Sequence, residues 1–561
     1  MRRLVAILVA LLLCPLAALG RPALPSAAQM DHDQMGQMDD GHDADAADHA
    51  LGTVHFATSC SAAVQADFDR GVAMLHSFWF VPAREAFAGV AQADPQCGMA
   101  YWGIAMTWLG NPFGGGVPPT WVAAGTAAVE QARAVGAATP RERAYIEAIA
   151  AYYEDAETRD YRTRALAYAG AMEQVYRTYP EDTEAAVFYA LALDVTAPPE
   201  DKTYANVLRA DAILEQVFAE QPDHPGVTHY LIHSNDYPPL AQHGLAAARR
   251  YAAIAPAVPH AQHMPSHIFT RLGYWEESIA SNLGSLDAAW AAAGDSDPTL
   301  APPDVLHPMD YLMYAYLQTG QDEQARAVRD EALAFRGATQ ETAGNAYAFA
   351  AIPARYALER GQWAEAAALT AHPVDFPWNR FPEAEAITTF ARALGAARNG
   401  DAVQARVDAE RLATLRDALT ATHQDYWAEQ VDIQREVARA WVAWADGQPD
   451  AALETLRAAA DHEAQTEKAP VTPGPLAPAR ELLGEMLLLA NAPAEALAAF
   501  EATLQVEPNR FRALYGAARA AEAAGDAEVA DQYYAQLLAT AEQADTERPE
   551  LAQARTYLAG R

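Results

Sequence analysis

The chain has 561 residues and carries 74 acidic against 39 basic side chains, which gives a formal net charge of −35. Nucleic-acid binding needs a basic surface, so this charge argues against a nucleic-acid partner and favours the attraction of cations. Hydrophobic residues make up 51% of the chain and aromatic residues only 9%. The many alanines favour helices, and the length allows several domains or one extended repeat array.

The first twenty residues have the pattern of a cleaved secretory signal. Two arginines precede an apolar run from Leu4 to Leu13, and small residues follow. Cleavage is expected after Gly20 or after Ala28, and the mature protein is expected to be periplasmic or secreted. Cys14 lacks the preceding small residue of a lipoprotein signal, so a lipid anchor is not expected. No later apolar run has the length of a membrane span.

Residues 21–55 are expected to form a disordered leader, because they show no apolar periodicity. The stretch MDHDQMGQMDDGHDADAADH within it resembles the Met/His-rich tails of periplasmic copper-handling proteins. Thioether and imidazole groups suit copper(I). The candidate capture ligands are Met30, His32, Met35, Met38, His42 and His49. The alternative is an acidic, solvated leader without a ligand.

Helix pairs with a common pattern begin near Val64. A unit starting there has Gly71, Ala83, Phe87 and Pro95 at positions 8, 20, 24 and 32. A unit starting at Ala477 has Gly484, Ala496, Phe500 and Pro508 at the same four positions. In this pattern the chain resembles the tetratricopeptide-repeat superfamily, and with its signal-like N-terminus it resembles an exported bacterial member of it. The resemblance implies an all-α solenoid of helix-turn-helix units wound into a right-handed superhelix.

The N-terminal pattern and this resemblance together predict five segments of the chain. Residues 1–20 are the signal peptide and 21–55 the leader. Residues 56–465 form a large repeat array, 466–478 a Pro-rich linker, and 479–561 a short C-terminal repeat pair. Cys60 and Cys97 remain after signal removal, and their spacing is close to one repeat. A disulfide is expected for an exported protein and contributes about 3–4 kcal/mol; the alternative is two unrelated buried thiols.

In tetratricopeptide proteins the first helix of each unit lines a concave groove, mainly through positions 2, 5, 9, 12 and 13. Units beginning at Pro225 and Pro259 are one 34-residue period apart, and a further unit begins at Leu306. Two i,i+4 pairs, His229 with His233 and His263 with His267, each share one helix face. The candidate metal ligands of these units are His229, His233, His263 and His267, followed by His260, His307, Asp236 and Asp310. Each aspartate is expected either to coordinate the ion or to orient a histidine.

So many imidazoles on one strip would repel one another once protonated, and a metal ion removes that problem. The residues suit copper, zinc or iron without selecting among them. The alternative is a hydrogen-bonded histidine network that ties helices to loops. Further groove-binding candidates are Arg271, Tyr314, Trp102 and Met106, of which the aromatic side chains are also typical of repeat core.

Sequence signatures of common enzymes are missing, including GxSxG, GxxxxGK[ST], GxGxxG and the complete HExxH motif. The sequence therefore predicts an exported repeat protein that binds or handles a transition metal, with copper as one candidate. The first alternative is an interaction scaffold that holds a peptide or protein in its groove. The second is a metal-dependent hydrolase or oxidase. Sequence alone specifies neither a partner nor an oligomeric state.

Overall fold

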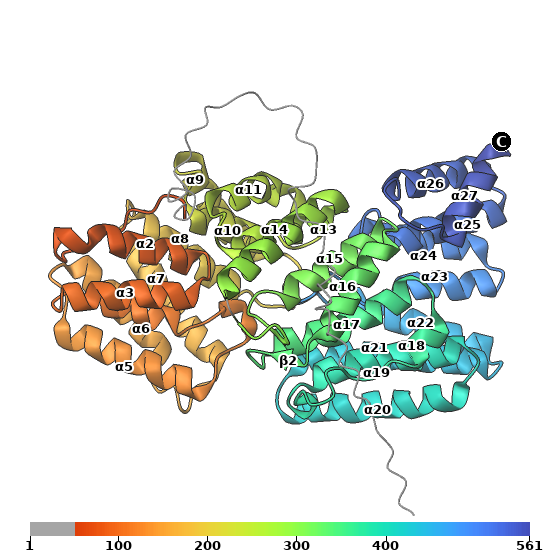
Figure 1. Cartoon of the computed structure of the whole chain (residues 1–561), viewed down its shortest axis with the longest axis horizontal. Helices are drawn as coiled ribbons and strands as arrows, with labels where there is room; N and C mark the ends of the chain where they lie inside the picture. Colours follow the sequence, from red (N-terminus) through yellow and green to blue (C-terminus); the bar gives the residue numbers. More distant parts are fainter. Residues whose placement is uncertain (1–50, 295, 561) are drawn as a thin grey trace, which may run out of the picture.

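A computed structural model describes residues 51–294 and 296–560 (Figure 1). The predicted signal peptide and the six Met and His residues of the leader lie outside the described residues. The described part is almost wholly helical, and no helix in it is long and apolar enough to cross a membrane. The predicted all-α fold is confirmed.

The helices of the N-terminal half are short and regularly spaced. They are η2 (Ala62–Val64), α2 (Gln65–His76), α3 (Phe80–Ala93), α4 (Gly98–Thr107), η3 (Pro112–Gly114), α5 (Pro119–Val135), α6 (Pro140–Tyr153), α7 (Tyr161–Thr178), α8 (Thr183–Val195), α9 (Ala205–Glu220), α10 (Pro225–Ser234), α11 (Ala241–Ile254), α12 (Pro259–His263), α13 (Pro265–Leu272) and α14 (Trp275–Ala293).

The second half continues with the same kind of helix. Its elements are β1 (Leu300–Ala301), α15 (Leu306–Gln318), α16 (Asp322–Ala334), β2 (Gly337–Ala338), α17 (Ala343–Glu359), α18 (Trp363–Ala367), η4 (Trp378–Arg380), α19 (Pro382–Arg398), α20 (Ala402–Ala421), α21 (Asp425–Ala445), α22 (Pro449–Glu463), α23 (Ala479–Leu489), α24 (Pro493–Val506), α25 (Phe511–Ala524), α26 (Ala527–Thr540) and α27 (Pro549–Ala559). The two short strands pair in parallel.

Consecutive helices pack as antiparallel pairs, and the first helices of neighbouring pairs also touch, as α2 does with α4 and α17 with α19. The predicted repeat positions explain this packing. A Cβ at Gly71 would lie 2.9 Å from the Phe87 ring, and one at Gly484 would lie 2.8 Å from the Phe500 ring. A small residue on the first helix therefore admits the aromatic ring of the second helix, in both units alike.

The buried apolar side chains form separate cores along the stack. One core includes residues from Leu51 to Phe269, a second from Trp275 to Ala520, and a third from Phe511 to Ala554. The second core continues on both sides of residues 466–478, which join α22 to α23. Whether these residues separate two domains stays a prediction.

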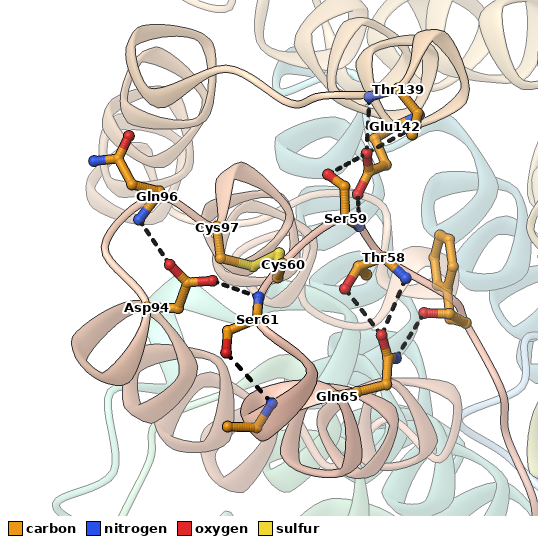
Figure 2. Close-up of a disulfide and its surroundings, with 12 residues drawn as sticks. Thr58, Ser59, Cys60, Ser61, Gln65, Asp94, Gln96, Cys97, Thr139 and Glu142 are labelled. Carbon is orange, nitrogen blue, oxygen red and sulfur yellow. Dashed lines mark hydrogen bonds between the residues drawn. A yellow bond between two sulfur atoms is a disulfide. The ribbon is translucent and has the colours of Figure 1, made fainter.

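The predicted disulfide between Cys60 and Cys97 is present (Figure 2). It ties the segment before α2 to the start of α4. The neighbouring backbone is held as well, because Asp94 accepts from the Ser61 amide at 2.7 Å and Glu142 accepts from the Ser59 amide at 2.6 Å. The cross-link thus fastens the N-terminal end of the described chain to the second helix pair.

Candidate metal centre

Six histidines from four helices form a continuous row inside the stack. They come from α10, α12, α13 and α15, whose pairs follow one another in the chain. We divide them into group A, which is His229, His233 and His260, and group B, which is His263, His267 and His307. Within each group the potential ligand atoms all lie within 4.8 Å of one another.

Group A converges through the Nε2 atoms of its rings. The Nε2 atom of His229 lies 3.2 Å from that of His233 and 3.1 Å from that of His260. The Nδ1 atom of His229 lies 2.6 Å from the carbonyl oxygen of His76. A carbonyl only accepts, so Nδ1 carries the proton and donates it. The Nε2 atom of neutral His229 is then a bare acceptor that faces the other two rings.

In group B, His263 has its tautomer set by an asparagine on α14. Its Nδ1 atom lies 2.7 Å from Oδ1 of Asn282. The Asn282 amide nitrogen donates to the Ser278 carbonyl at 2.7 Å, which fixes which end of the amide faces the histidine. Nδ1 of His263 therefore donates a hydrogen bond, and Nε2 of the neutral ring bears a lone pair.

His267 is set in the same way by a carboxylate. Its Nδ1 atom lies 2.9 Å from Asp236 Oδ2, while Asp236 also accepts from Arg271 Nε at 2.9 Å and from Lys468 Nζ at 2.7 Å. Burial alone would raise the pKa of Asp236, but Lys468 and Arg271 hold it well below its ordinary value. The ionised carboxylate can only accept, so His267 donates from Nδ1 and its Nε2 is bare.

These two bare nitrogens face each other at 3.0 Å. Burial lowers the pKa of His263 well below its ordinary value and also lowers the pKa of His267, although Asp236 opposes the second shift. At neutral pH neither ring holds the second proton that a hydrogen bond between them would require. Two lone pairs at this distance repel, and a shared cation converts that repulsion into coordination.

His307 completes group B, with its ring centroid 4.4 Å from that of His263. Burial lowers its pKa to about 3. Groups A and B adjoin each other, since the ring centroids are 6.3 Å apart for His233 and His267 and 6.4 Å apart for His260 and His263. The row is thus two neighbouring three-histidine groups.

A third group, His76, Glu184 and His224, has similar composition but different chemistry. Glu184 lies 2.7 Å from Nε2 of His76 and 3.0 Å from Nε2 of His224. The Tyr230 hydroxyl bonds Nδ1 of His76, and the Val227 amide donates to Nδ1 of His224. Every ring nitrogen has a compatible partner, so this group is a complete hydrogen-bond network that needs no ion.

Two of the predicted carboxylates have other partners. Asp310 does not lie with the histidines as predicted. Its carboxylate pairs with Arg355, which reaches it from α17 at 2.8 Å. Asp236 does lie beside group B. Its oxygens bond His267, Arg271 and Lys468, so of its two predicted roles it has the one that orients a histidine.

The other predicted groove residues also differ in their surroundings. Arg271 binds Asp236 and thereby supports group B. The Tyr314 hydroxyl bonds Glu507 and Arg510, away from the histidines. Trp102 is a core residue, since it packs edge-on against Phe56 and Phe188 and is 1% exposed. Met106 is buried beside the Tyr168 hydroxyl. All three are buried, and the groove role predicted for them stays a prediction.

Several important residues were not predicted, and for two of them the sequence held a usable signal. His76 is at inner position 13 of the unit that begins at Val64, and Glu184 is at position 2 when counted from Thr183, the first residue of α8. Lys468 gave no such signal, because it lies 232 residues after Asp236. His224 is buried in the Glu184 network.

Residues 466–478 cover group B from outside the helices. Besides Lys468, the segment accepts hydrogen bonds from the Tyr311 hydroxyl at the carbonyls of Pro470 and Thr472, at 3.1 and 3.0 Å. Arg355 donates to the carbonyl of Gly474 at 2.9 Å. The inner face of α15 and α17 at this point is therefore occupied by the chain itself.

No family model matches the chain, and no curated protein matches it. Solved structures do match. One is the Cut9–Hcn1 hetero-tetramer of APC/C, at 12% identity over 89% of this chain and 95% of that chain, with a TM-score of 0.27. The P58(IPK) TPR domain matches at 12% identity over 89% and 99%, with a TM-score of 0.19. A tetratricopeptide repeat protein from Parabacteroides merdae matches at 10% identity over 67% and 99%, with a TM-score of 0.24.

The repeated fit of Phe87 against Gly71 and of Phe500 against Gly484, at opposite ends of the stack, is the packing that the repeat pattern requires. The described chain is a solenoid of helix pairs, and these two units pack as the tetratricopeptide pattern predicts. Within this solenoid, groups A and B lie on the helices that begin the units at Pro225, Pro259 and Leu306. The unit register therefore brings together residues that are up to 78 positions apart, from His229 to His307.

Proposed function

We propose that this protein binds transition-metal ions through groups A and B, as an exported metal-binding or metal-handling protein. The observation that carries the proposal is the distance of 3.0 Å between the Nε2 atoms of His263 and His267. The Nδ1 protons of both rings are donated to other residues, Asn282 and Asp236. Nitrogen ligands at about 2.0–2.1 Å from a tetrahedral ion lie about 3.3 Å apart. The spacings of 3.0 to 3.2 Å in the two groups are close to that value.

Neutral imidazoles suit copper, zinc and iron, and burial keeps these rings neutral. In each group the polypeptide supplies three ligands and leaves further coordination positions to water or another small ligand. The signal-like N-terminus supports a periplasmic or secreted location. The Met/His-rich leader supports a role for copper, as a segment that captures the ion ahead of the histidine groups.

Elemental analysis tests the proposal on the mature protein purified from an exporting host. About two ions per chain are expected, one in each group. The variants His229→Ala/His233→Ala and His263→Ala/His267→Ala should each lose about one ion and keep the other. A matched control, His243→Ala/His423→Ala, changes two exposed histidines outside both groups and should keep both ions. Deletion of residues 21–49 should also keep both.

A negative result has a defined form. If the folded wild-type protein holds no metal after reconstitution with copper, zinc and iron in turn, the proposal is wrong. Circular dichroism of each variant shows whether a loss of metal follows from a loss of fold instead.

An interaction scaffold is the second candidate function, and the stacked helix pairs favour it because solenoids present long inner surfaces to partners. Near group B that surface is covered by residues 466–478, so a peptide would bind elsewhere along the stack. A scaffold predicts partner capture that is unchanged by chelators and by the histidine variants.

A metal-dependent hydrolase or oxidase is the third candidate, favoured by the three protein ligands in each group. Catalytic zinc sites commonly have three protein ligands and one exchangeable water. This candidate predicts turnover that is lost on chelation and restored by metal.

A further inference from the structure

A separate cavity adjoins group A. It has a volume of about 50 Å³, and its walls are almost entirely apolar. It lies among α2, α4, α7 and α8 and is lined on those helices by side chains such as Leu75, Met106, Ala165, Phe188 and Leu191. A water molecule needs about 10–15 Å³ measured in this way, so the cavity has room for about four water-sized groups. Its apolar walls offer water few hydrogen bonds.

Five hydroxyl-bearing side chains line the cavity, and four have hydrogen-bond partners. The hydroxyls are those of Tyr152, Tyr161, Tyr168, Tyr230 and Thr196. Tyr161 bonds Pro112, and Tyr168 bonds Met106. Tyr230 bonds His76, and Thr196 bonds Ala192. The buried Tyr152 hydroxyl has no partner among the described residues. Buried polar groups are rarely left unbonded, so a partner that enters the cavity would satisfy it.

Phe78 separates this cavity from group A. Its ring lines the cavity and also contacts all three histidines, with centroid distances of 4.4 Å to His229, 5.9 Å to His233 and 5.5 Å to His260. Phe78 has φ of 54°, a left-handed conformation that costs a bulky residue about 1–2 kcal/mol. The surrounding structure therefore holds this ring at the boundary against a local cost.

The loop between α4 and α5 forms another part of the boundary. Gly110 and Pro112 line the cavity, and the next residue, Phe113, stacks on His233 with ring centroids 4.1 Å apart. Gly115 and Gly116 have positive φ values, and a Cβ at Gly114 or Gly115 would meet nothing within 4 Å. The loop thus carries an aromatic ring onto a group A histidine while its tip remains free of close packing.

We propose that the cavity binds a small, uncharged, mostly apolar molecule with one hydrogen-bonding group, of about the bulk of a short alcohol. The apolar walls contact the body of the molecule, and the Tyr152 hydroxyl bonds its polar group. The bound molecule lies against Phe78, one aromatic ring away from group A. Binding does not depend on metal in the histidine groups.

Propan-2-ol and 2-chloropropane are suitable probes, because they have similar bulk and only propan-2-ol has a hydroxyl. Ligand-observed NMR titration of the mature protein, in metal-free and metal-loaded forms, measures both affinities. Saturable propan-2-ol binding with a Kd below about 10 mM is expected in both forms. Tyr152→Phe should weaken propan-2-ol binding about fivefold, the effect of one hydrogen bond, and leave 2-chloropropane binding unchanged.

Filling the cavity gives an independent test. Ala165→Leu places a larger side chain in the wall and should abolish binding of both probes. Ala167→Leu makes the same change two residues along α7, outside the lining, and should bind both as the wild type does. If Ala165→Leu does not fold, the difference between propan-2-ol and 2-chloropropane in Tyr152→Phe decides the question.

Two results would overturn the proposal: no saturable binding of either probe to the folded wild-type protein, or equal binding to folded Ala165→Leu and Ala167→Leu. Neither depends on whether the protein holds metal, so a failure here is distinct from a failure of the proposed metal function.

Discussion

The ammonium group of Lys468 lies 2.7 Å from the carboxylate of Asp236, although the two residues are 232 positions apart. Both side chains are more than nine-tenths buried. Burial lowers the pKa of Lys468 to about 8, with Asp236 opposing the shift, so the lysine remains a cation at neutral pH. This pair keeps Asp236 ionised and thereby sets the direction of the hydrogen bond from His267.

Asp236→Asn should weaken metal binding at group B alone. An asparagine can present its amide nitrogen to His267, which would move the ring proton to Nε2 and block the lone pair that faces His263. Loss of such an orienting carboxylate typically lowers metal affinity about 10- to 100-fold. Competition with a chromophoric zinc chelator measures the zinc affinity of group A and of group B.

Asp223→Asn is the matched control, because Asp223 is exposed and pairs with Arg250 on the surface. It should leave both affinities unchanged. Equal weakening at groups A and B in Asp236→Asn would contradict the assigned role of Asp236.

Asp194 should make stability depend on pH. Burial, together with Asp211 and Asp236, raises its pKa to about 8, and its Oδ2 atom has no hydrogen-bond partner among the described residues. The unfolded chain ionises this carboxyl near pH 4, whereas the folded chain keeps it protonated up to about pH 8. Wild-type stability is therefore penalised increasingly as pH rises from about 4 to 8.

Asp194→Asn removes that titration. The free energy of unfolding of the variant, relative to wild type, should rise by about 2–4 kcal/mol between pH 4 and pH 7. Urea unfolding at several pH values measures the difference. Asp223→Asn again serves as an exposed control, for which we expect a change below about 0.5 kcal/mol. A flat difference for Asp194→Asn would mean that the carboxyl ionises normally in the folded protein.

Glu184→Gln should destabilise the N-terminal core. Burial alone would raise the pKa of Glu184, but His76 and His224 lower it, and both rings donate to the carboxylate from Nε2. A glutamine side chain has one carbonyl oxygen, so it can accept from one of the two histidine rings only. The N–H group of the other ring would then face the N–H groups of the glutamine amide. The expected loss in the free energy of unfolding is about 2–4 kcal/mol at pH 7.

Because the folded pKa of Glu184 is depressed, its contribution is complete above about pH 5 and is lost as the pH falls below about 4. The gap between wild type and Glu184→Gln should therefore narrow in acid. Glu181→Gln, at an exposed position just before α8, is the control and should behave as wild type. Urea unfolding followed at pH 7 and at pH 3.5 distinguishes the two cases.

Removal of the disulfide should lower stability without changing metal content. The link between Cys60 and Cys97 closes a loop with a sequence separation of 37 residues, for which chain entropy gives about 3–4 kcal/mol. Cys60→Ser/Cys97→Ser should show this loss in urea unfolding, and a reductant should change wild type but not the variant. Elemental analysis should give the same metal content for both, since the bond lies outside groups A and B.

The sequence was enough to predict the fold because the residues that indicate the fold lie close together in the chain. Gly71 with Phe87, and Gly484 with Phe500, lie within single units, and each pair packs as the unit pattern requires. His263 ends α12 and His267 lies near the start of α13, but their i,i+4 spacing is still a local feature, and their Nε2 atoms do meet. Where one helix or one repeat decided the outcome, the sequence was sufficient.

The remainder of the candidate site depended on partners from distant elements. Asp310 shares its helix with His307, but Arg355 from another helix pair binds its carboxylate. Asn282, on α14, fixes the tautomer of His263. No spacing within one unit indicates which of two carboxylates an arginine will neutralise. The sequence therefore placed Asp236 beside a histidine but gave no sign that Arg355 pairs with Asp310.

Residues 466–478 come after α22 in the chain, yet they supply a cation that fixes Asp236. A chain that stopped before Lys468 would still contain all six histidines of groups A and B. It would lack the lysine that keeps the Asp236 acceptor charged, and the carbonyls that hold Tyr311. The number of histidines in a fragment is thus a poor guide to whether group B can bind metal. A proteolytic cut within residues 466–478 would weaken group B and leave all six histidines in place.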